Sequence, residues 1–153
     1  VKDERKKERA TRLDEQMNRL NERWTTHFTN VLNRLDDILG KIQVRADKAA
    51  SLGKDVSAVK TAIDAAKTAI ASARAAVEAQ AKKDYTITFT SEGELRTAFK
   101  AAKDQLHKDL TALRDGAVKA ARDAVHNAAR SLGGVPKVDE EPEESTTPAP
   151  SAQ

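Results

Sequence analysis

The chain has 153 residues, of which 33% are charged and only 3% are aromatic, a composition typical of long amphipathic helices and not of a globule with a thick apolar core. Its net charge of +3 is unevenly distributed, because residues 133–153 hold one basic and five acidic side chains. That segment therefore carries −4 and the rest of the chain +7, an imbalance compatible with binding to nucleic acid, to an anionic surface or to a complementary end of the same protein.

A first long helix is predicted over residues 2–52, because apolar residues recur there at alternating steps of three and four. Such a helix would be about 75 Å long, and Gly53 is suited to cap its C-terminal end. Its expected apolar seam, the stripe that faces other helices, consists of Leu13, Met17, Leu20, Trp24, Phe28, Val31, Leu35, Ile38, Ile42, Ala46 and Ala49.

A second helix is predicted over residues 55–83, with Asp55 as its N-cap. Its apolar seam runs from Val56 to Val77, and a stripe of alanines lies beside that seam. Small residues on two adjacent stripes are expected to allow two neighbouring helices to approach this one closely at the same time.

The next segment, residues 84–90, has a different pattern. Tyr85, Ile87 and Phe89 alternate with three threonines, and a period of two is typical of a β-strand. Two interpretations stay open: an extended loop whose apolar face packs on the helices, or an edge strand that pairs with another subunit.

A third helix is predicted over residues 92–132, since Ser91 and Glu94 form a capping box and two glycines after Leu132 end the apolar pattern. Its expected seam consists of Leu95, Phe99, Ala102, Leu106, Leu110, Leu113, Ala117, Ala121, Val125, Ala128 and Leu132. Residues 133–153 form an acidic tail rich in Pro, Ser and Thr, a composition that does not build a packed core.

Together these elements predict an all-α fold, in which residues 1–132 form an antiparallel three-helix bundle or coiled coil with a short strand-like loop. With short connections the helix lengths do not match, so the helix ends are expected to be staggered. About twenty N-terminal residues and the end of the third helix, near residues 123–132, would then extend past their neighbours. Apolar seams that stay exposed at two such ends would favour head-to-tail assembly.

No pattern of catalytic or ligand-binding residues accompanies these helices. The chain has no cysteine, and its three histidines lack the spacing of a metal site. Phosphate-binding loops, dinucleotide fingerprints and nucleophile elbows are absent from the sequence, so we expect no enzymatic activity, no cofactor and no small-molecule substrate. Lysine and arginine are interspersed with acidic residues along every helix, which argues against nucleic-acid binding. No apolar run approaches the ~20 residues of a transmembrane helix.

Three stretches carry a resemblance: ERKKERATRLDEQ (residues 4–16), GKDVSAVKTAI (53–63) and SEGELRTAFKAAKDQL (91–106). Together they resemble a family of small, secreted, predicted coiled-coil proteins encoded by uncultured bacteria with reduced genomes. The resemblance implies a cell-surface or extracellular location and carries no catalytic residues. Members of that family tend to have one cysteine in the first helix and one before the third, whereas this sequence has neither.

We therefore expect a non-enzymatic extracellular structural protein that self-associates as a homo-oligomer, in its most specific form as a filament subunit. Because the sequence starts at Val1 and not at Met, we expect that a signal peptide has been removed, although a sequence shortened for another reason would start in the same way. One alternative is an extracytoplasmic helical chaperone or adaptor that binds client proteins, including other surface proteins. Another is a binder of nucleic acid or anionic surfaces, which a steep salt dependence would reveal. The candidate self-assembly contacts are Leu13, Met17, Leu20, Trp24, Tyr85, Ile87, Phe89, Val125 and Leu132.

Overall fold

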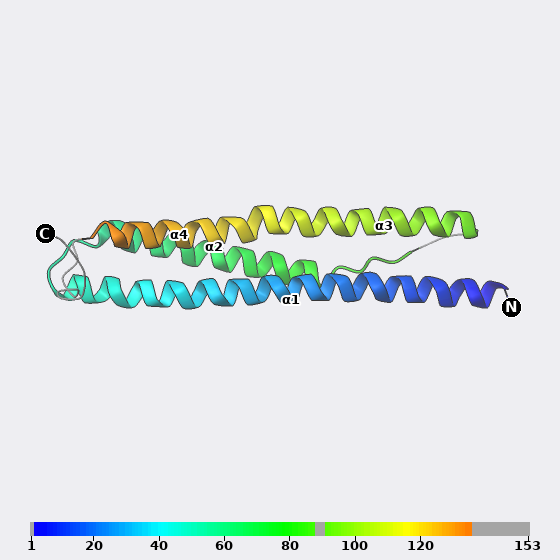
Figure 1. Cartoon of the computed structure of the whole chain (residues 1–153), viewed down its shortest axis with the longest axis horizontal. Coiled ribbons are helices and arrows are strands. Elements are labelled where there is room, and N and C mark those ends of the chain that lie inside the picture. The colour runs from blue at the N-terminus through cyan, green and yellow to red at the C-terminus, as the bar shows by residue number, and fades with distance from the viewer. Residues whose placement is uncertain (1, 88–90, 136–153) are drawn as a thin grey trace, which may run out of the picture. The chain divides into compact units, whose positions relative to one another are not determined.

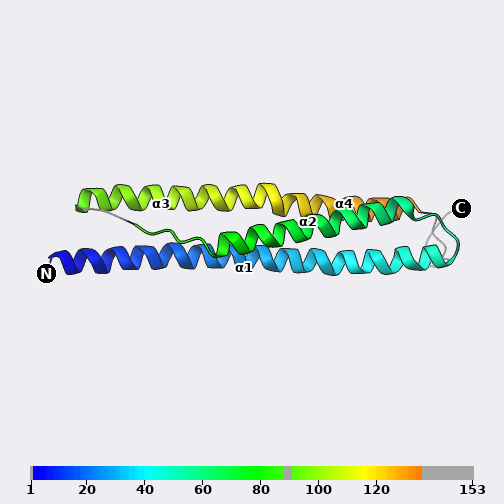
Figure 2. The same cartoon turned by 180° about the vertical axis from the view of Figure 1, so that it is seen from behind.

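The computed structural model describes residues 2–87 and 91–135 and confirms an all-α helical bundle, with no strand among those residues (Figures 1 and 2). The helical segments are α1 (Lys2–Ser51), α2 (Ser57–Ala81), α3 (Glu92–Leu113), the π-helical segment η1 (Arg114–Val118) and α4 (Lys119–Gly133). The chain divides into two compact units, unit 1 (Val1–Asn33 and Ala71–Ala120) and unit 2 (Arg34–Ile70 and Ala121–Gln153).

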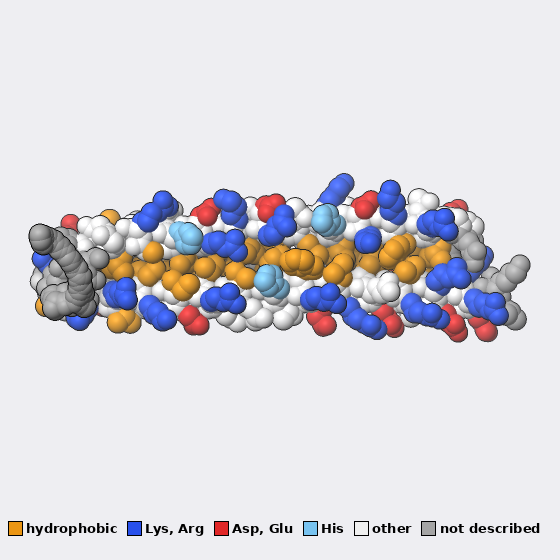
Figure 3. Space-filling view, viewed as in Figure 1, with side chains coloured by type: hydrophobic (Ala, Val, Ile, Leu, Met, Phe, Trp, Pro, Cys, Tyr) orange, Lys and Arg blue, Asp and Glu red, His pale blue; other side chains and the backbone are white. Residues whose placement is uncertain are grey.

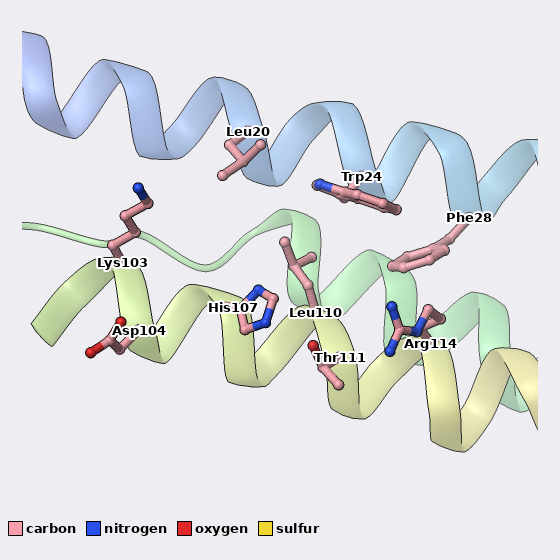
Figure 4. A pocket seen from close by; sticks show the side chains of 9 residues that line it. All are labelled: Leu20, Trp24, Phe28, Lys103, Asp104, His107, Leu110, Thr111 and Arg114. Atoms are coloured by element: carbon pink, nitrogen blue, oxygen red, sulfur yellow. The ribbon is translucent and has the colours of Figure 1, made fainter. Parts of the chain in front are cut away.

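In unit 1 the helices alternate in direction. Asn21 on α1 bonds to Gln80 on α2, and Asn33 farther along α1 bonds to Arg74. Residue numbers therefore rise along α1 as they fall along α2, which makes the two helices antiparallel. α3 runs in the same direction as α1 (Figure 4). The principal buried apolar side chains of unit 1 are Met17, Phe28, Leu32, Val77, Leu95, Leu106, Leu110, Leu113 and Val118.

In unit 2 a glycine-capped turn connects α1 to α2. Gly53 has a φ of 82°, its N–H donates to the Ala50 carbonyl, and the Lys54 N–H donates to the Ala49 carbonyl. These two bonds form a Schellman motif, which satisfies carbonyls at the helix end and confirms the predicted cap. The buried apolar side chains of unit 2 are Leu35, Leu39, Ile42, Ala46, Val56, Val59, Ile63, Ala66, Ile70, Ala121, Val125 and Ala128.

The second helix is shorter than predicted, because it begins at Ser57 and ends at Ala81. Asp55 lies two residues before the helix, where its carboxylate accepts bonds from the backbone N–H and the hydroxyl of Ser57. Asp55 therefore orders the turn that leads into the helix. The N-cap predicted at Ser91 is confirmed, since its side chain accepts a bond of 3.2 Å from the Glu94 N–H.

The predicted third helix is interrupted by η1. The predicted seam placed Ala117 in the core, but the structure buries Val118 and leaves Ala117 half-buried. The step from Leu113 to Val118 is five residues, and the wider π-helical turn accommodates this extra residue. The larger valine thereby enters the core, and the regular spacing of three and four continues into α4.

The predicted overhangs also require correction. The overhangs were predicted from a short connection after α2, but this segment runs alongside α1 toward its N-terminal part in both views (Figures 1 and 2). The Ile87 N–H donates to the Asp14 carboxylate at 3.0 Å, which fixes this course. As a result Ala10 and Met17 are buried within unit 1. At the other predicted overhang Val125 is buried within unit 2.

Two glycines make a matched pair for testing the α1 backbone. Gly40 lies inside the helix, with open space where the methyl group of an alanine would lie, so Gly40→Ala is expected to raise the free energy of unfolding by about 1 kcal/mol. Gly53 has a positive φ, so Gly53→Ala is expected to lower it by about 1 kcal/mol. Urea denaturation measures both changes. Equal effects of the two substitutions would contradict the placement of Gly40 inside the helix and of Gly53 at a cap with positive φ.

Candidate functional site

A chain of polar side chains lies inside unit 1. Gln80 donates from its Nε2 to the Asn21 Oδ1 at 2.8 Å and to the Tyr85 hydroxyl at 2.8 Å. The Asn21 amide in turn donates to the Gln80 carbonyl at 2.9 Å. Asn21 and Gln80 are only 2% and 4% exposed, and buried polar groups of this kind are stabilising when they are fully paired.

The network ends at a carboxylate on α3. The Tyr85 hydroxyl donates to the Asp109 Oδ2 at 2.5 Å, and the Lys83 amino group lies 3.5 Å from the same oxygen. One set of bonds therefore connects α1, α2, the segment after α2 and α3, which we call the interhelical network (Asn21, Gln80, Lys83, Tyr85 and Asp109). It holds the segment after α2 in place and is best understood as a structural element.

The network changes the pKa of its two acidic groups, the Tyr85 phenol and the Asp109 carboxyl. Burial is the main cause that raises the pKa of Tyr85 to about 12, and the neighbouring Asp109 carboxylate adds to the effect. Burial alone would raise the pKa of Asp109, but bonds from Tyr85 and Gln105 and the charge of Lys83 together lower it. The stabilisation from Asp109 is therefore present above its ordinary pKa of 3.8 and is lost as the pH falls through its lower folded value.

An open apolar pocket lies between α1 and α3 in unit 1 (Figure 4). Its volume is about 190 Å³, and Figure 4 shows Leu20, Trp24 and Phe28 on one side facing Leu110 and His107 on the other. The complete lining is Leu20, Trp24, Phe28, Lys103, Asp104, His107, Leu110, Thr111 and Arg114. We call this feature the unit 1 groove.

Trp24 gives the groove an exposed aromatic surface. Its side chain is 38% exposed, whereas Phe28, one turn farther along, is buried. The Trp24 ring meets the rings of His27 and Phe28 at centroid distances of 5.8 Å each. Neighbouring rings restrict the positions that Trp24 can adopt, so a large apolar surface is presented in a defined orientation.

Basic side chains border the groove. Lys103 and Arg114 line it from α3 and η1, and Arg114 is paired with its neighbour Asp115 at 2.8 Å. Over α3 and the adjoining part of α1, Figure 3 shows an apolar stripe with Lys and Arg close along both sides and most carboxylates farther out. The groove therefore combines an apolar floor with cationic margins.

The structure brings together only two of the nine predicted contact residues, Leu20 and Trp24, in the groove. Met17, Tyr85 and Ile87 are buried within unit 1, and Val125 is buried within unit 2. Leu13 and Leu132 are half-buried. Phe89 lies outside the described residues.

On the α3 side of the groove Leu110 lies on the predicted seam, but Lys103, His107 and Arg114 were not predicted from the sequence. These residues recur at steps of four and seven, and such spacing marks one face of a helix. Their pairing with Leu20 and Trp24 depends on the course of the segment after α2, and the sequence pattern did not predict that course.

Neither a protein-family model, a curated protein nor a solved structure matches the chain. Within residues 2–87 and 91–135, no group of three or more His, Asp or Glu side chains is arranged to hold a metal ion. In the same part of the chain no helix has the length and apolar character needed to cross a bilayer.

Proposed function

We propose that this chain is a non-enzymatic structural protein that self-associates through the unit 1 groove. The observation that supports the proposal is the apolar groove around Trp24, which stays open to solvent in the single chain. Covering Trp24 and the half-buried Leu20 would remove apolar surface from water, which stabilises a contact by about 25 cal/mol per Å². An exposed tryptophan in a concave, partly apolar site is also typical of residues that dominate binding energy.

The geometry of the contact decides which assembly forms. If the groove receives a different surface of the second copy, each contact leaves one groove and one complementary surface available. Repetition of such a contact gives a ring or an open filament. In its most specific form the proposal is therefore that the chain is a filament subunit outside the cell.

Replacing Trp24 with alanine tests the proposal. We expect the self-association constant to fall at least about tenfold, since truncating a central aromatic contact commonly costs about 2 kcal/mol or more. Sedimentation velocity over a concentration series measures the constant, and negative-stain electron microscopy of the same samples shows whether filaments form. Circular dichroism checks that the helices persist in the variant.

Val44 provides the matched control. It is also a large apolar residue on α1 and is 68% exposed, but it belongs to unit 2. Val44→Ala is therefore expected to leave association unchanged. If the native chain sediments as a single species at every concentration, or if Trp24→Ala assembles as well as the native chain, self-association through this groove is wrong.

The adaptor alternative is supported by the same exposure of Trp24, because an open apolar groove can also receive an apolar side chain of a different protein. It predicts a protein that stays a monomer yet suppresses aggregation of an unfolded client. In that case Trp24→Ala would abolish the suppression without changing the sedimentation of the chain.

A further inference from the structure

We propose that the occupant of the unit 1 groove is the acidic, proline-containing segment 136–150 of a second copy of this chain. The inference rests on the proposed function, namely self-association through this groove, and names the part of the partner that enters it. Three properties support the assignment: the aromatic floor, the cationic margins and the size of the pocket.

The aromatic floor of the groove matches the prolines of the segment. Proline-containing segments bind grooves lined by aromatic rings, because they present apolar rings on a backbone that loses little entropy on binding. The groove exposes Trp24 beside His27 and Phe28. All four prolines of the chain lie within residues 136–150.

The cationic margins of the groove match the acidic residues of the segment. Lys103 and Arg114 line the groove, and further basic side chains follow both margins of the apolar stripe (Figure 3). Asp104 is a carboxylate in the lining, and Asp115 pairs with Arg114, so the cationic character is moderate. The proposed occupant contains five acidic residues and one lysine, and it is the most acidic part of the sequence.

The size of the pocket suits a proline ring. The pocket has a volume of about 190 Å³, and an apolar cavity of about 150 Å³ can hold a benzene molecule. A proline ring has one ring atom fewer than benzene, so the volume of the pocket is sufficient for one such ring. Larger anchors are not required.

A groove-to-groove contact between two copies is less favourable on the same grounds. It would bring the basic margins of one copy against the identical margins of the other, and like charges facing each other across an interface oppose association. An acidic segment in the groove instead places negative charges against the basic margins, and opposite charges favour association. It also creates a contact between different surfaces, as open assembly requires.

The first test neutralises the segment in the full-length chain. Asp139→Asn with Glu140→Gln, Glu141→Gln, Glu143→Gln and Glu144→Gln removes its negative charges and keeps its prolines and approximate side-chain sizes. We expect this neutral-tail variant to self-associate at least about tenfold more weakly than the native chain, and the native association to weaken with added salt.

The second test uses Trp24, the only tryptophan of the chain, as a reporter inside the groove. A synthetic peptide of residues 136–153 is titrated into the neutral-tail variant while tryptophan emission is recorded. We expect a saturable change in emission. A control peptide with the same five neutral substitutions should bind at least about tenfold more weakly.

Reversing one charge tests whether the peptide binds at the groove or elsewhere on the surface. Lys103→Glu is expected to weaken binding of the native peptide, whereas Lys67→Glu changes the net charge equally on α2 of unit 2 and should not. A peptide in which the five acids are replaced by lysine should then bind Lys103→Glu more tightly than it binds the native groove.

The outcomes distinguish this inference from the proposed function. If the neutral-tail variant assembles as well as the native chain while Trp24→Ala does not, the groove mediates self-association with another occupant, and the inference is overturned. If the peptide binds but the native chain stays monomeric, occupancy by a second copy is overturned together with the proposed function. An emission change equal for both peptides would overturn the role of charge in the contact.

Discussion

Replacing Gln80 with leucine is expected to lower the free energy of unfolding by about 3 kcal/mol, although leucine has a similar volume and a greater apolar surface. The reason is the position of the Gln80 amide, which donates to both Asn21 and Tyr85 inside unit 1. In the leucine variant the Asn21 Oδ1 loses the hydrogen bond from Gln80, and Asn21 is only 2% exposed. An unpaired buried acceptor costs about 1–3 kcal/mol, and the weakened support of Tyr85 adds to that cost. Urea denaturation measures the change.

The matched control is Gln43→Leu. Gln43 also donates from its amide, but to Asp47 one turn farther along the exposed surface of α1. Its loss is expected to change the free energy of unfolding by less than about 0.5 kcal/mol. Equal effects at Gln80 and Gln43 would show that the interhelical network does not stabilise the fold.

A double substitution makes the test sharper. In Asn21→Leu with Gln80→Leu, both partners of the side-chain bond are removed, so no Asn21 acceptor is left unpaired. The Gln80 carbonyl still accepts a bond from the Lys83 N–H. The double variant is therefore expected to be less destabilised than the sum of the two single variants, by about 1–2 kcal/mol.

The periodic apolar pattern was sufficient to predict three helical stretches, both capped ends at Gly53 and Ser91, and the all-α class. These features are local, because a cap or an amphipathic face depends on residues within a few positions of each other. The packing of Leu35, Ile42 and Ala46 on the predicted seam of α1 followed from the same pattern.

Other parts of the α1 core were assigned incorrectly for a physical reason. Trp24 and Ile38 were expected to pack in the seam but are exposed, while Asn21 and Thr25 are buried. A helix that contacts two neighbours buries a face wider than one seam. Polar residues enter that face when their bonds are satisfied between elements, as Asn21 does with Gln80. A search for apolar spacing alone cannot detect such residues.

Only the α1 side of the groove contained predicted contact residues. Leu20 and Trp24 were candidate contacts, but the opposing residues depend on where α3 begins relative to α1. The Asp14–Ile87 bond and the Tyr85–Asp109 bond fix that relation, and both join residues distant in sequence. η1 then places Arg114 beside the groove, and an isolated π-helical turn has no strong sequence signal.

Raising the pH from 10 to 12 is expected to lower the free energy of unfolding by about 1–2 kcal/mol through Tyr85 alone. Burial, assisted by Asp109, raises the pKa of this phenol from 10.0 to about 12. Below pH 10 the phenol is protonated in both states, so its full contribution is present. Between those values the unfolded chain loses the proton first, which favours unfolding, and above the folded pKa the contribution is gone. This difference in pKa between the folded and unfolded chain changes the free energy of unfolding by at most about 2.7 kcal/mol, and partial contact of the phenol with solvent makes the change smaller.

Tyr85 is the only tyrosine of the chain, so phenolate absorbance reports its titration directly. The native protein should titrate at about pH 12 and the urea-unfolded chain at about pH 10. Comparing urea denaturation of the native chain with Tyr85→Phe at each pH removes the general effect of lysine deprotonation, and the difference isolates the phenol. A native titration at the ordinary value of tyrosine would mean that Tyr85 leaves the interhelical network easily. The segment after α2 would then not be held against α1 and α3, and the unit 1 groove would lose the element that sets its register.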